Sequence, residues 1–500
     1  MFSEILMQVI ALDNLMIILG CTLYGTFVGA IPGLTATMAV ALLVPFTFYL
    51  DPVPAISAIV ATTTTAIFAG DISGTLLRIP GTPASAAYID DAYRLSKVGR
   101  AKTSLLVSVT TAAIGGVVGV IILSLLAPQL ARIAISFSSF ESFWLACLGL
   151  TCAVLTGHGT VPKSLASLFI GLAIASVGID IAVGHPRFTF GLPELLDGIS
   201  FIPAMIGIFA FSEVLRSVQS TLNGQAAAAS AKEKLGQAAA RAGRALGTYR
   251  TTIARSSIMG TLIGALPGAG ADIAAWISYA VARRFSKEPE KFGNGHLEGI
   301  AAGGSANNAA IAGAWTPSLV FGIPGDSVTA IAIGVLMLKG LSPGPRIFID
   351  QPELIHTLFG SFFLANIIML PMGLLAIMMS SYILRIPRAI MTPIILLFSL
   401  VGAYAINGTA VAIWIVLGLG ITGYFMEENG IPLAPAILGI VLGKIIEDNF
   451  MVSMIKAQGN ISAFFEREYS MILGVATVLL WCYLIVRTGV ELMSKRHRNL

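Results

Sequence analysis

The sequence predicts an all-α integral membrane protein built from two inverted-topology repeats, each with a re-entrant hairpin, a broken transmembrane helix and about four further helices. Composition, the order of recurring motifs and the charge of matching loops lead to this prediction. Of the 500 residues, 56% are hydrophobic and 11% are charged, whereas soluble domains carry about 25% charged residues. The mean hydropathy is +0.86. Most of the surface must therefore face lipid, and apolar runs of about twenty residues are long enough to cross it.

Charge and residue spacing exclude several classes of function. The net charge of +4 comes from short basic clusters, which are typical of cytoplasmic loops beside an anionic leaflet, and no basic aromatic face for nucleic acid is visible. The four cysteines contain no CxxC pair, so we expect neither a disulfide nor a metal site. Phosphate-loop, GxSxG and HExxH motifs are absent, so neither ATP hydrolysis nor another enzyme activity is predicted. The first residues do not resemble a cleaved signal peptide.

Four motifs occur twice in the same order. GTFVGAIPGL begins at Gly25 and GTLIGALPGA at Gly260. The other pairs are IPG at 79–81 and 323–325, GT at 159–160 and 408–409, and PAMIGI at 203–208 with PAILGI at 435–440. The second copy follows the first by about 230 to 250 residues each time, which indicates an internal repeat.

Matching loops of the two repeats carry opposite charge. The connection after the first hairpin contains Asp51, whereas the second is basic with Arg283, Arg284, Lys287 and Lys291. The loop after the first IPG is basic over 94–102, whereas the loop after the second has Asp350 and Glu353 beside Arg346. Because positive loops face the cytoplasm, equivalent loops are predicted on opposite sides of the membrane, which defines an inverted repeat.

The elements can be placed in order. The first repeat is expected over 1–219, with a hairpin at 14–50, a broken crossing at 54–91 and helices near 103–128, 139–157, 163–182 and 199–219. Residues 220–251 are predicted to be a cytoplasmic linker with an amphipathic helix. The second repeat, 252–470, has a hairpin at 252–284, a broken crossing at 299–341 and helices near 355–381, 388–406, 409–426 and 431–447. Residues 471–500 add a transmembrane helix and a basic cytoplasmic tail. Loop charge fits re-entrant hairpins and full double crossings equally.

Four Pro-Gly pairs interrupt apolar segments at corresponding places, and small or hydroxyl residues follow them. Backbone groups freed by such breaks are tolerated only inside protein or beside a water-filled cavity. A half-helix N-terminus also favours anions. We infer an anionic solute site at these tips, and the substrate-binding candidates are Pro32, Gly33, Thr35, Arg78, Pro80, Gly81, Thr82, Ser85, Pro267, Gly268, Gly270, Asn307, Asn308, Pro324, Gly325, Asp326 and Ser327. The glycines before the breaks, Gly25, Gly29, Gly260 and Gly264, serve either this site or close helix packing.

Polar groups at membrane depth add candidates for ion coupling, namely Thr64, Asp71, Asp272 and Asn308. Asn307 and Asn308 contact either a solute or a neighbouring helix. Arg78 pairs either with Asp71 or with a substrate carboxylate.

The chain resembles the large membrane subunit of the tripartite tricarboxylate transporter family, TctA. The resemblance covers nearly the whole chain and is carried by IPGTPASAA after residue 78 and by SANNAA with the following GIPG. It implies a multi-pass carrier of the bacterial inner membrane for small di- or tricarboxylates, with a small membrane subunit and a periplasmic solute-binding protein as partners. It also implies a Na⁺ or H⁺ gradient as driving force and no other cofactor. Family members usually have Asn where Arg78 stands and often have Pro-Glu where Gly303-Gly304 stands, so one acid common in the family is missing here.

These observations predict an elevator-like secondary transporter whose C-terminus is cytoplasmic. A passive anion channel and a structural subunit of a membrane complex are the alternatives, and the sequence leaves a homo-oligomer open.

Overall fold

The computed structural model describes residues 8–156, 160–180, 184–220, 233–267, 270–383 and 388–498. Helices dominate, and the only strands in these ranges are β1 (Gly178–Ile179) and β2 (Pro186–Arg187), which pair antiparallel. Within the same ranges, six helices are long and apolar enough to cross a membrane. The predicted class, an all-α integral membrane protein, is confirmed.

The first half begins with a helical hairpin and a long buried helix. Its elements are α2 (Leu12–Ala30), α3 (Ala36–Thr47), α4 (Pro52–Leu77), η1 (Ser85–Ala87), α5 (Ile89–Lys97), α6 (Ala101–Ala134), α7 (Ser139–Thr156), α8 (Val161–Ala175), η2 (Pro193–Leu195), α9 (Phe201–Met205), the π-helical turn η3 (Ile206–Phe211) and α10 (Ser212–Ser220).

The second half has the same order of hairpin, long helix and short helix. Its elements are α12 (Arg250–Gly264), α13 (Gly270–Phe285), η4 (Pro289–Lys291), α14 (Leu297–Phe321), α15 (Ser327–Leu338), α16 (Ile347–Asp350), α17 (Pro352–Ile383), α18 (Arg388–Asn407), α19 (Ala410–Glu428), α20 (Leu433–Lys456), η5 (Ile461–Phe465) and α21 (Glu468–Arg498). The predicted amphipathic helix before it is α11 (Leu235–Thr248), which buries three alanines, Ala238, Ala242 and Ala245.

Two predicted helix ends are wrong. The helix expected over 163–182 ends at Ala175, because the chain turns at Gly178, whose φ is +130°, into the β1–β2 ribbon. The helix expected over 431–447 continues to Lys456. Its charged residues do not end it because Glu447 is paired with Arg187 of the ribbon, whose Nη2 lies 2.7 Å from the carboxylate.

Matching glycines pack the helices of each half in the same way. A Cβ on Gly25 or Gly29 of α2 would overlap the backbone of α4 at Thr62 or Ala66, which lie 37 residues further on. In the second half, Gly260 and Gly264 of α12 meet the α14 backbone at Ala306 and Ala310. For these four glycines, close helix packing is therefore the observed role. The orientation of each half in the membrane stays a prediction.

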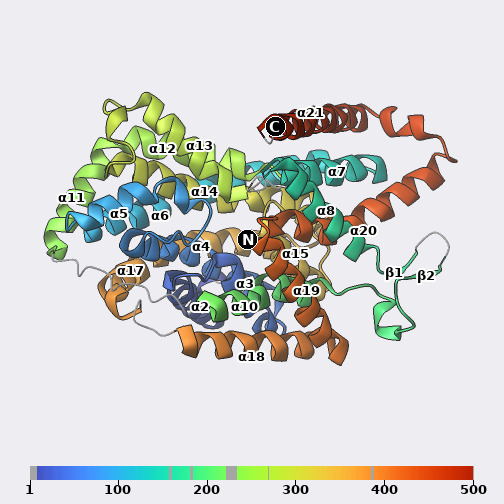
Figure 1. The fold of residues 1–500 in the computed structure, drawn as a ribbon, viewed down its shortest axis with the longest axis horizontal. Coiled ribbons are helices and arrows are strands. Elements are labelled where there is room, and N and C mark those ends of the chain that lie inside the picture. Colours follow the sequence, from blue (N-terminus) through green and yellow to red (C-terminus); the bar gives the residue numbers. More distant parts are fainter. Residues whose placement is uncertain are drawn as a thin grey trace.

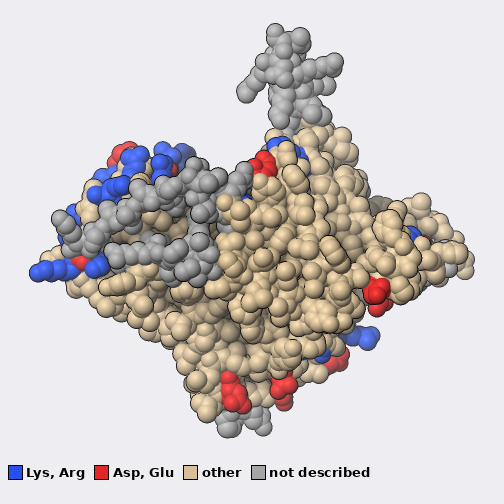
Figure 2. Space-filling model, turned by 60° about the horizontal axis from the view of Figure 1, so that its bottom comes forward, with Lys and Arg blue, Asp and Glu red and all other residues tan. Residues whose placement is uncertain are grey.

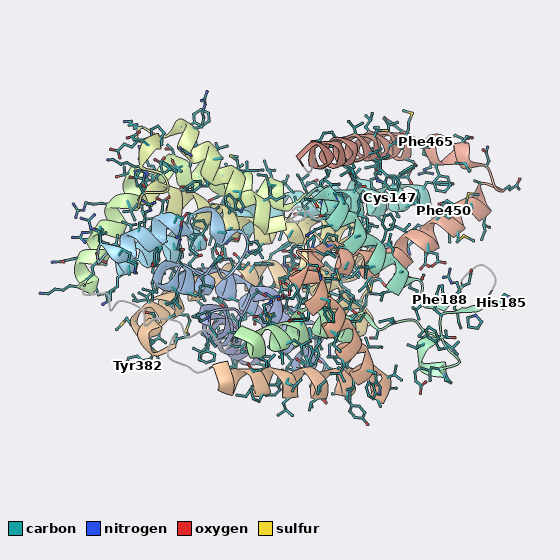
Figure 3. The ribbon with its side chains drawn as sticks, viewed as in Figure 1. Cys147, His185, Phe188, Tyr382, Phe450 and Phe465 are labelled. Atoms are coloured by element: carbon teal, nitrogen blue, oxygen red, sulfur yellow. The ribbon has the colours of Figure 1, made fainter. Side chains whose placement is uncertain are left out.

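The helices form two groups that lie side by side. Figure 1 shows α4, α5, α6, α11, α12, α13, α14 and α17 on one side and α7, α8, α20 and α21 on the other. α14 packs against α6, α12 and α13, whereas α20 packs against α7 and α8. The β1–β2 ribbon, with Phe188 and His185, projects from the body of helices beyond α20 (Figure 3).

On the face shown in Figure 2, the visible charged side chains lie in a few areas. Figure 2 shows Lys and Arg gathered at the end where α5 and α11 lie, next to a wide face with almost no charge. Such an uncharged face is what a lipid-facing surface requires.

Candidate functional site

A cavity of about 790 Å³ lies where the first hairpin tip meets both broken crossings. It receives residues 33–38 from the hairpin, 79–83 from the break after α4, and 326–328 from the break before α15. The predicted residues that line it are Gly33, Thr35, Pro80, Gly81, Thr82, Asn307, Asp326 and Ser327. Segments more than 200 residues apart in sequence are thus brought to one place.

The first hairpin tip presents the start of α3 to the cavity. Gly33 has a φ of +92°, a conformation that glycine adopts without strain, and the chain then enters α3. The Thr35 hydroxyl caps the helix by accepting the Met38 N–H at 3.2 Å. Within the first turn of the helix, the Thr37 hydroxyl lies 3.0 Å from the Ser327 hydroxyl of the second half. The tip therefore offers hydroxyl groups and the positive end of a helix dipole.

The second break differs from expectation, because its helix is already capped by an acid. Asp326 accepts the Thr329 N–H at 2.7 Å, and the Thr329 hydroxyl completes a capping box. The Asp326 carboxylate thus already accepts a hydrogen bond from an N–H group that was expected to be free to bind an anion. Gly325 donates its N–H to Ser318 at 3.3 Å, and a Cβ there would crowd Ala314.

The loop after α4 is held by its own hydroxyls. Ser85, which does not line the cavity, donates to the Thr82 carbonyl at 2.8 Å, and its N–H donates to the Thr82 hydroxyl at 3.1 Å. Gly81 approaches Gly70 of α4 so closely that a Cβ on either would meet the other's backbone. Close packing fixes this loop at the cavity wall.

The described residues of the second hairpin tip lie outside the cavity lining. Pro267 packs near α7, where a Cβ on Gly149 would lie 3.5 Å from its own. Gly268 lies outside the described residues, and Gly270 begins α13. Asp272 lies in the first turn of α13, and its side chain is not among those described.

The two asparagines have different surroundings, although both are 2% exposed. Asn308 donates to the Thr64 carbonyl of α4 at 3.3 Å and contacts the Met369 sulfur of α17 at 3.5 Å. These contacts link α14 to α4 and α17, and the Asn308 Oδ1 has no hydrogen-bond partner among the described residues. Asn307 lines the cavity, and its Oδ1 has no hydrogen-bond partner among the described residues. That acceptor is thus available for another group.

Arg78 and Asp71 do not pair with each other. Arg78 ends α4 in a left-handed conformation with φ of 60°, and its Nε donates to Asp90 at 2.8 Å. Its guanidinium also lies 5.9 Å from the centre of the Tyr93 ring. Asp71 is buried and accepts hydroxyls from Tyr88 and Ser108. The helix end at Arg78 turns its side chain away from the carboxylate.

A charged group at one end of the cavity was not predicted. Arg216 of α10 forms ion pairs with Glu213, at 3.2 Å, and with Glu427 of α19. The neighbouring Glu428 and residues 430–434 also line the cavity. The repeated PAMIGI and PAILGI motifs lie beside these residues in sequence, and they were the signal that could have located them.

The sequence profile of the tripartite tricarboxylate transporter TctA family matches residues 15–438, a range that contains all the cavity-lining segments. The chain belongs to this family. It is therefore the membrane component of a transport system, in a family of transport proteins and not of enzymes.

Two relatives come from Agrobacterium vitis. An uncharacterized 52.8 kDa protein in the TAR-I ttuC' 3' region is 33% identical over 442 residues, which cover 88% of this chain and 87% of that relative. An uncharacterized protein in the TAR-II ttuC' 3' region is 36% identical over 205 residues, which cover 41% of this chain and 85% of that relative. No solved structure matches the chain.

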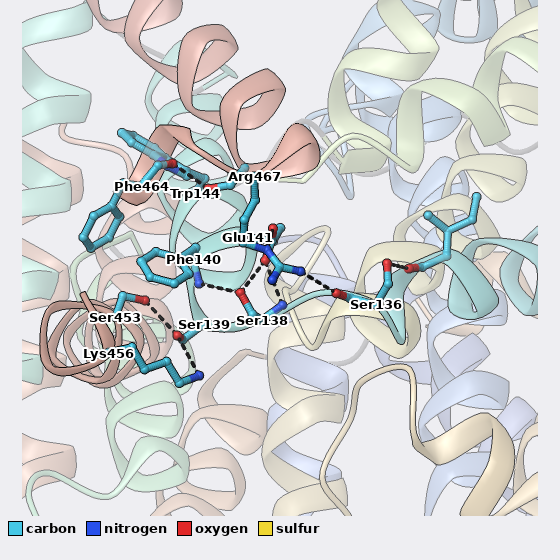
Figure 4. A network of polar contacts seen from close by, with 12 residues as sticks. Ser136, Ser138, Ser139, Phe140, Glu141, Trp144, Ser453, Lys456, Phe464 and Arg467 are labelled. Atoms are coloured by element: carbon cyan, nitrogen blue, oxygen red, sulfur yellow. Dashed lines mark hydrogen bonds and ion pairs between the residues drawn. The ribbon is translucent and has the colours of Figure 1, made fainter. Parts of the chain in front are cut away.

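In this TctA-family protein, a polar network joins α7 to α20 and to the segment before α21 (Figure 4). Arg467 donates to the buried Glu141 carboxylate at 2.7 Å, and Glu141 also accepts the Ser138 N–H at 2.8 Å. Ser139 and Ser453 join α7 to α20 through hydroxyls 2.8 Å apart. The network ties the helices of the second group together.

A second polar contact joins the two halves of the TctA-family chain. The Asp91 carboxylate of α5 is fully buried and accepts the N–H groups of Gly295 and His296 at 2.7 and 2.8 Å. The Tyr279 hydroxyl of α13 donates to it at 2.7 Å. Three donors compensate the burial of this charge.

Proposed function

We propose that this chain is a secondary active transporter that imports small di- or tricarboxylates across the bacterial inner membrane. A periplasmic binding protein delivers the substrate, a small membrane subunit completes the complex, and an ion gradient drives uptake. One observation carries the proposal: hydroxyl, amide and helix-N-terminal groups from both halves line one cavity in a TctA-family protein.

The cavity chemistry supports binding of carboxylates. Its volume of about 790 Å³ falls within the range of roughly 300–1,000 Å³ that small-molecule sites occupy. Thr37, Thr82 and Ser327 supply hydroxyl donors, and α3 supplies the positive end of its dipole. Neutral donors of this kind bind a carboxylate without requiring a permanent cation in the membrane.

The acidic residues of the lining are largely compensated. Glu213 and Glu427 pair with Arg216, which is the only Lys or Arg among the described lining residues. The Asp326 carboxylate caps α15. Arg216 can therefore meet a substrate carboxylate once one of its acidic partners moves away.

The layout of the cavity supports a carrier over a channel. Its lining runs from the first hairpin tip to the ends of α10 and α19, which loop charge places at the cytoplasmic face. None of the described lining residues comes from the predicted periplasmic connection at 342–354. Access from one side at a time is what alternating access requires.

The test is uptake into proteoliposomes that contain the chain with its small membrane subunit and the loaded binding protein. A panel of labelled di- and tricarboxylates is offered with and without an imposed ion gradient. We expect saturable, gradient-dependent accumulation that unlabelled substrate competes away. Flux that rises linearly with concentration and ignores the gradient would instead identify a channel.

A further inference from the structure

Asp71 is a buried acid in the middle of the first group of helices. It lies on α4, is 5% exposed, and forms no ion pair with a basic residue in the described part of the chain. The groups that contact its carboxylate are the Tyr88 hydroxyl, at 2.9 and 3.0 Å from its two oxygens, and the Ser108 hydroxyl of α6. A carboxylate at membrane depth without a cation is costly, which is why such residues are commonly functional.

The carboxylate is connected to the cavity through two side chains. Tyr88 donates to Asp71, and the Asn307 side chain lies within hydrogen-bonding reach of the same Tyr88 hydroxyl. Asn307 lines the cavity, and its Oδ1 is unpartnered among the described residues. A series of contacts therefore leads from the cavity through Asn307 and Tyr88 to Asp71.

The position of Tyr88 depends on a glycine of α14. A Cβ on Gly303 would overlap the Tyr88 ring, so the ring occupies the space that a side chain at this position would fill. Tyr88 is 2% exposed and is thus fixed between α4 and α14. The hydroxyl is held where it can contact both Asp71 and Asn307.

We propose that Asp71 is the residue that carries the coupling proton, and that Tyr88 and Asn307 link its protonation to the cavity; this rests on the proposed carrier function. One proton adds to a carboxylate oxygen on the outer side and leaves to the cytoplasm after substrate translocation. In the charged state Tyr88 donates to Asp71. Once Asp71 is protonated, the neutral acid accepts the Tyr88 O–H more weakly than the carboxylate does, so the Tyr88 hydroxyl can shift against the Asn307 amide. The amide facing the substrate is then held differently in the two states.

The contacts favour a proton over a metal cation. Two hydroxyl groups, those of Tyr88 and Ser108, donate to the Asp71 carboxylate, which suits an anion that exchanges a proton. A Na⁺ or another hard cation would need several oxygen lone pairs converging on one point. Arg78 does not neutralise Asp71, because it is paired with Asp90.

The experiment separates coupling from transport by two assays on the reconstituted complex. The first measures accumulation of labelled carboxylate driven by an inward proton gradient in Na⁺-free buffer. The second measures exchange between internal and external substrate without a gradient. Asp71→Asn should lose the accumulation and keep the exchange, whereas Asp71→Glu should keep both.

Tyr88→Phe provides an independent test that leaves the carboxylate in place. It should keep exchange but shift the pH profile of accumulation, because the link to Asn307 is lost. Proton-driven accumulation by Asp71→Asn, or an unchanged pH profile in Tyr88→Phe, would overturn the proposal. Failure of both assays with the unmodified complex would refute the carrier function itself, and the coupling proposal with it.

Discussion

The hydroxyl groups of Thr37 and Ser327 lie 3.0 Å apart, one in the first turn of α3 and the other in the first turn of α15. They come from different halves of the chain, and both line the cavity. This contact joins the first hairpin tip to the second break at the place proposed for the substrate.

Loss of either hydroxyl should weaken substrate binding. Thr37→Val and Ser327→Ala each remove one donor, and a hydrogen bond contributes about 0.5–1.5 kcal/mol, so we expect KM for uptake to rise roughly two- to tenfold. Ser57→Ala is the matched control, because Ser57 forms a similar 2.8 Å hydroxyl contact with Ser361 but does not line the cavity. Equal effects of all three variants on KM would contradict the assigned site.

Neighbouring asparagines should respond differently to the same substitution. Asn307→Ala removes a cavity group and should abolish uptake, while thermal unfolding in detergent changes little. Asn308→Ala removes the contact with the Thr64 carbonyl, so it should lower the unfolding temperature, with a cost of about 0.5–1.5 kcal/mol. Uptake and thermal unfolding are measured on both purified variants. Normal uptake by Asn307→Ala would remove this residue from the site.

Glycines at the helix contacts should tolerate no side chain. Gly29→Ala and Gly264→Ala place a methyl group against the facing helix backbone, and overpacking of this kind costs about 1–3 kcal/mol. Gly20→Ala on the same helix α2 meets nothing within 4 Å and serves as control. We expect a lower unfolding temperature for the first two variants only, measured by the thermal stability of the detergent-solubilised protein. Alanine is the better helix former, so a destabilised control would show that the contact with the facing helix does not decide the effect.

Substitution of Arg216 and substitution of its partner Glu427 should change substrate affinity in opposite directions. Arg216→Gln removes the positive charge that pairs with Glu213 and Glu427 at the cavity, so an anionic substrate should bind more weakly and KM should rise. Glu427→Gln frees the guanidinium, so KM should fall. Initial rates of uptake over a range of substrate concentrations measure both. A shift of KM in the same direction for both variants would exclude an electrostatic role for Arg216.

The predicted orientation of the two halves can be tested by labelling. In a background without the native cysteines, Val98→Cys should react with a membrane-impermeant maleimide only from the cytoplasmic side, and Ile349→Cys only from the periplasmic side. Both side chains are well exposed, at 69% and 61%, so access does not limit the reaction. Reaction of both from the same side would rule out inverted repeats.

The helix breaks that proline and glycine cause could be predicted from the sequence. Pro80-Gly81 and Pro324-Gly325 follow the two long buried helices as predicted, because proline removes an N–H group and glycine permits close approach to the facing helix. The partner of Arg78 was not predictable, because it depends on the left-handed turn that directs the side chain to Asp90.

Residues contributed by distant helices escaped prediction for a different reason. Glu213, Arg216 and Glu427 lie at the ends of α10 and α19, where charged residues usually mark only the edge of the membrane. Their place at the cavity follows from the packing of α10 against α19, which the neighbouring PAMIGI and PAILGI repeats indicate only by their position in the sequence. Similarly, the different surroundings of Asn307 and Asn308 follow from which helix each one faces.

The Asp91 contact constrains how the chain is made. Its carboxylate is buried by N–H groups that lie 204 and 205 residues further along the chain. While the ribosome is still synthesising the intervening segments, α5 therefore has a charge without its final partners and must stay in contact with water. The first half cannot reach its finished state until residue 296 has emerged. The two halves thus mature together, and an N-terminal fragment expressed alone is expected to be a target for proteolysis.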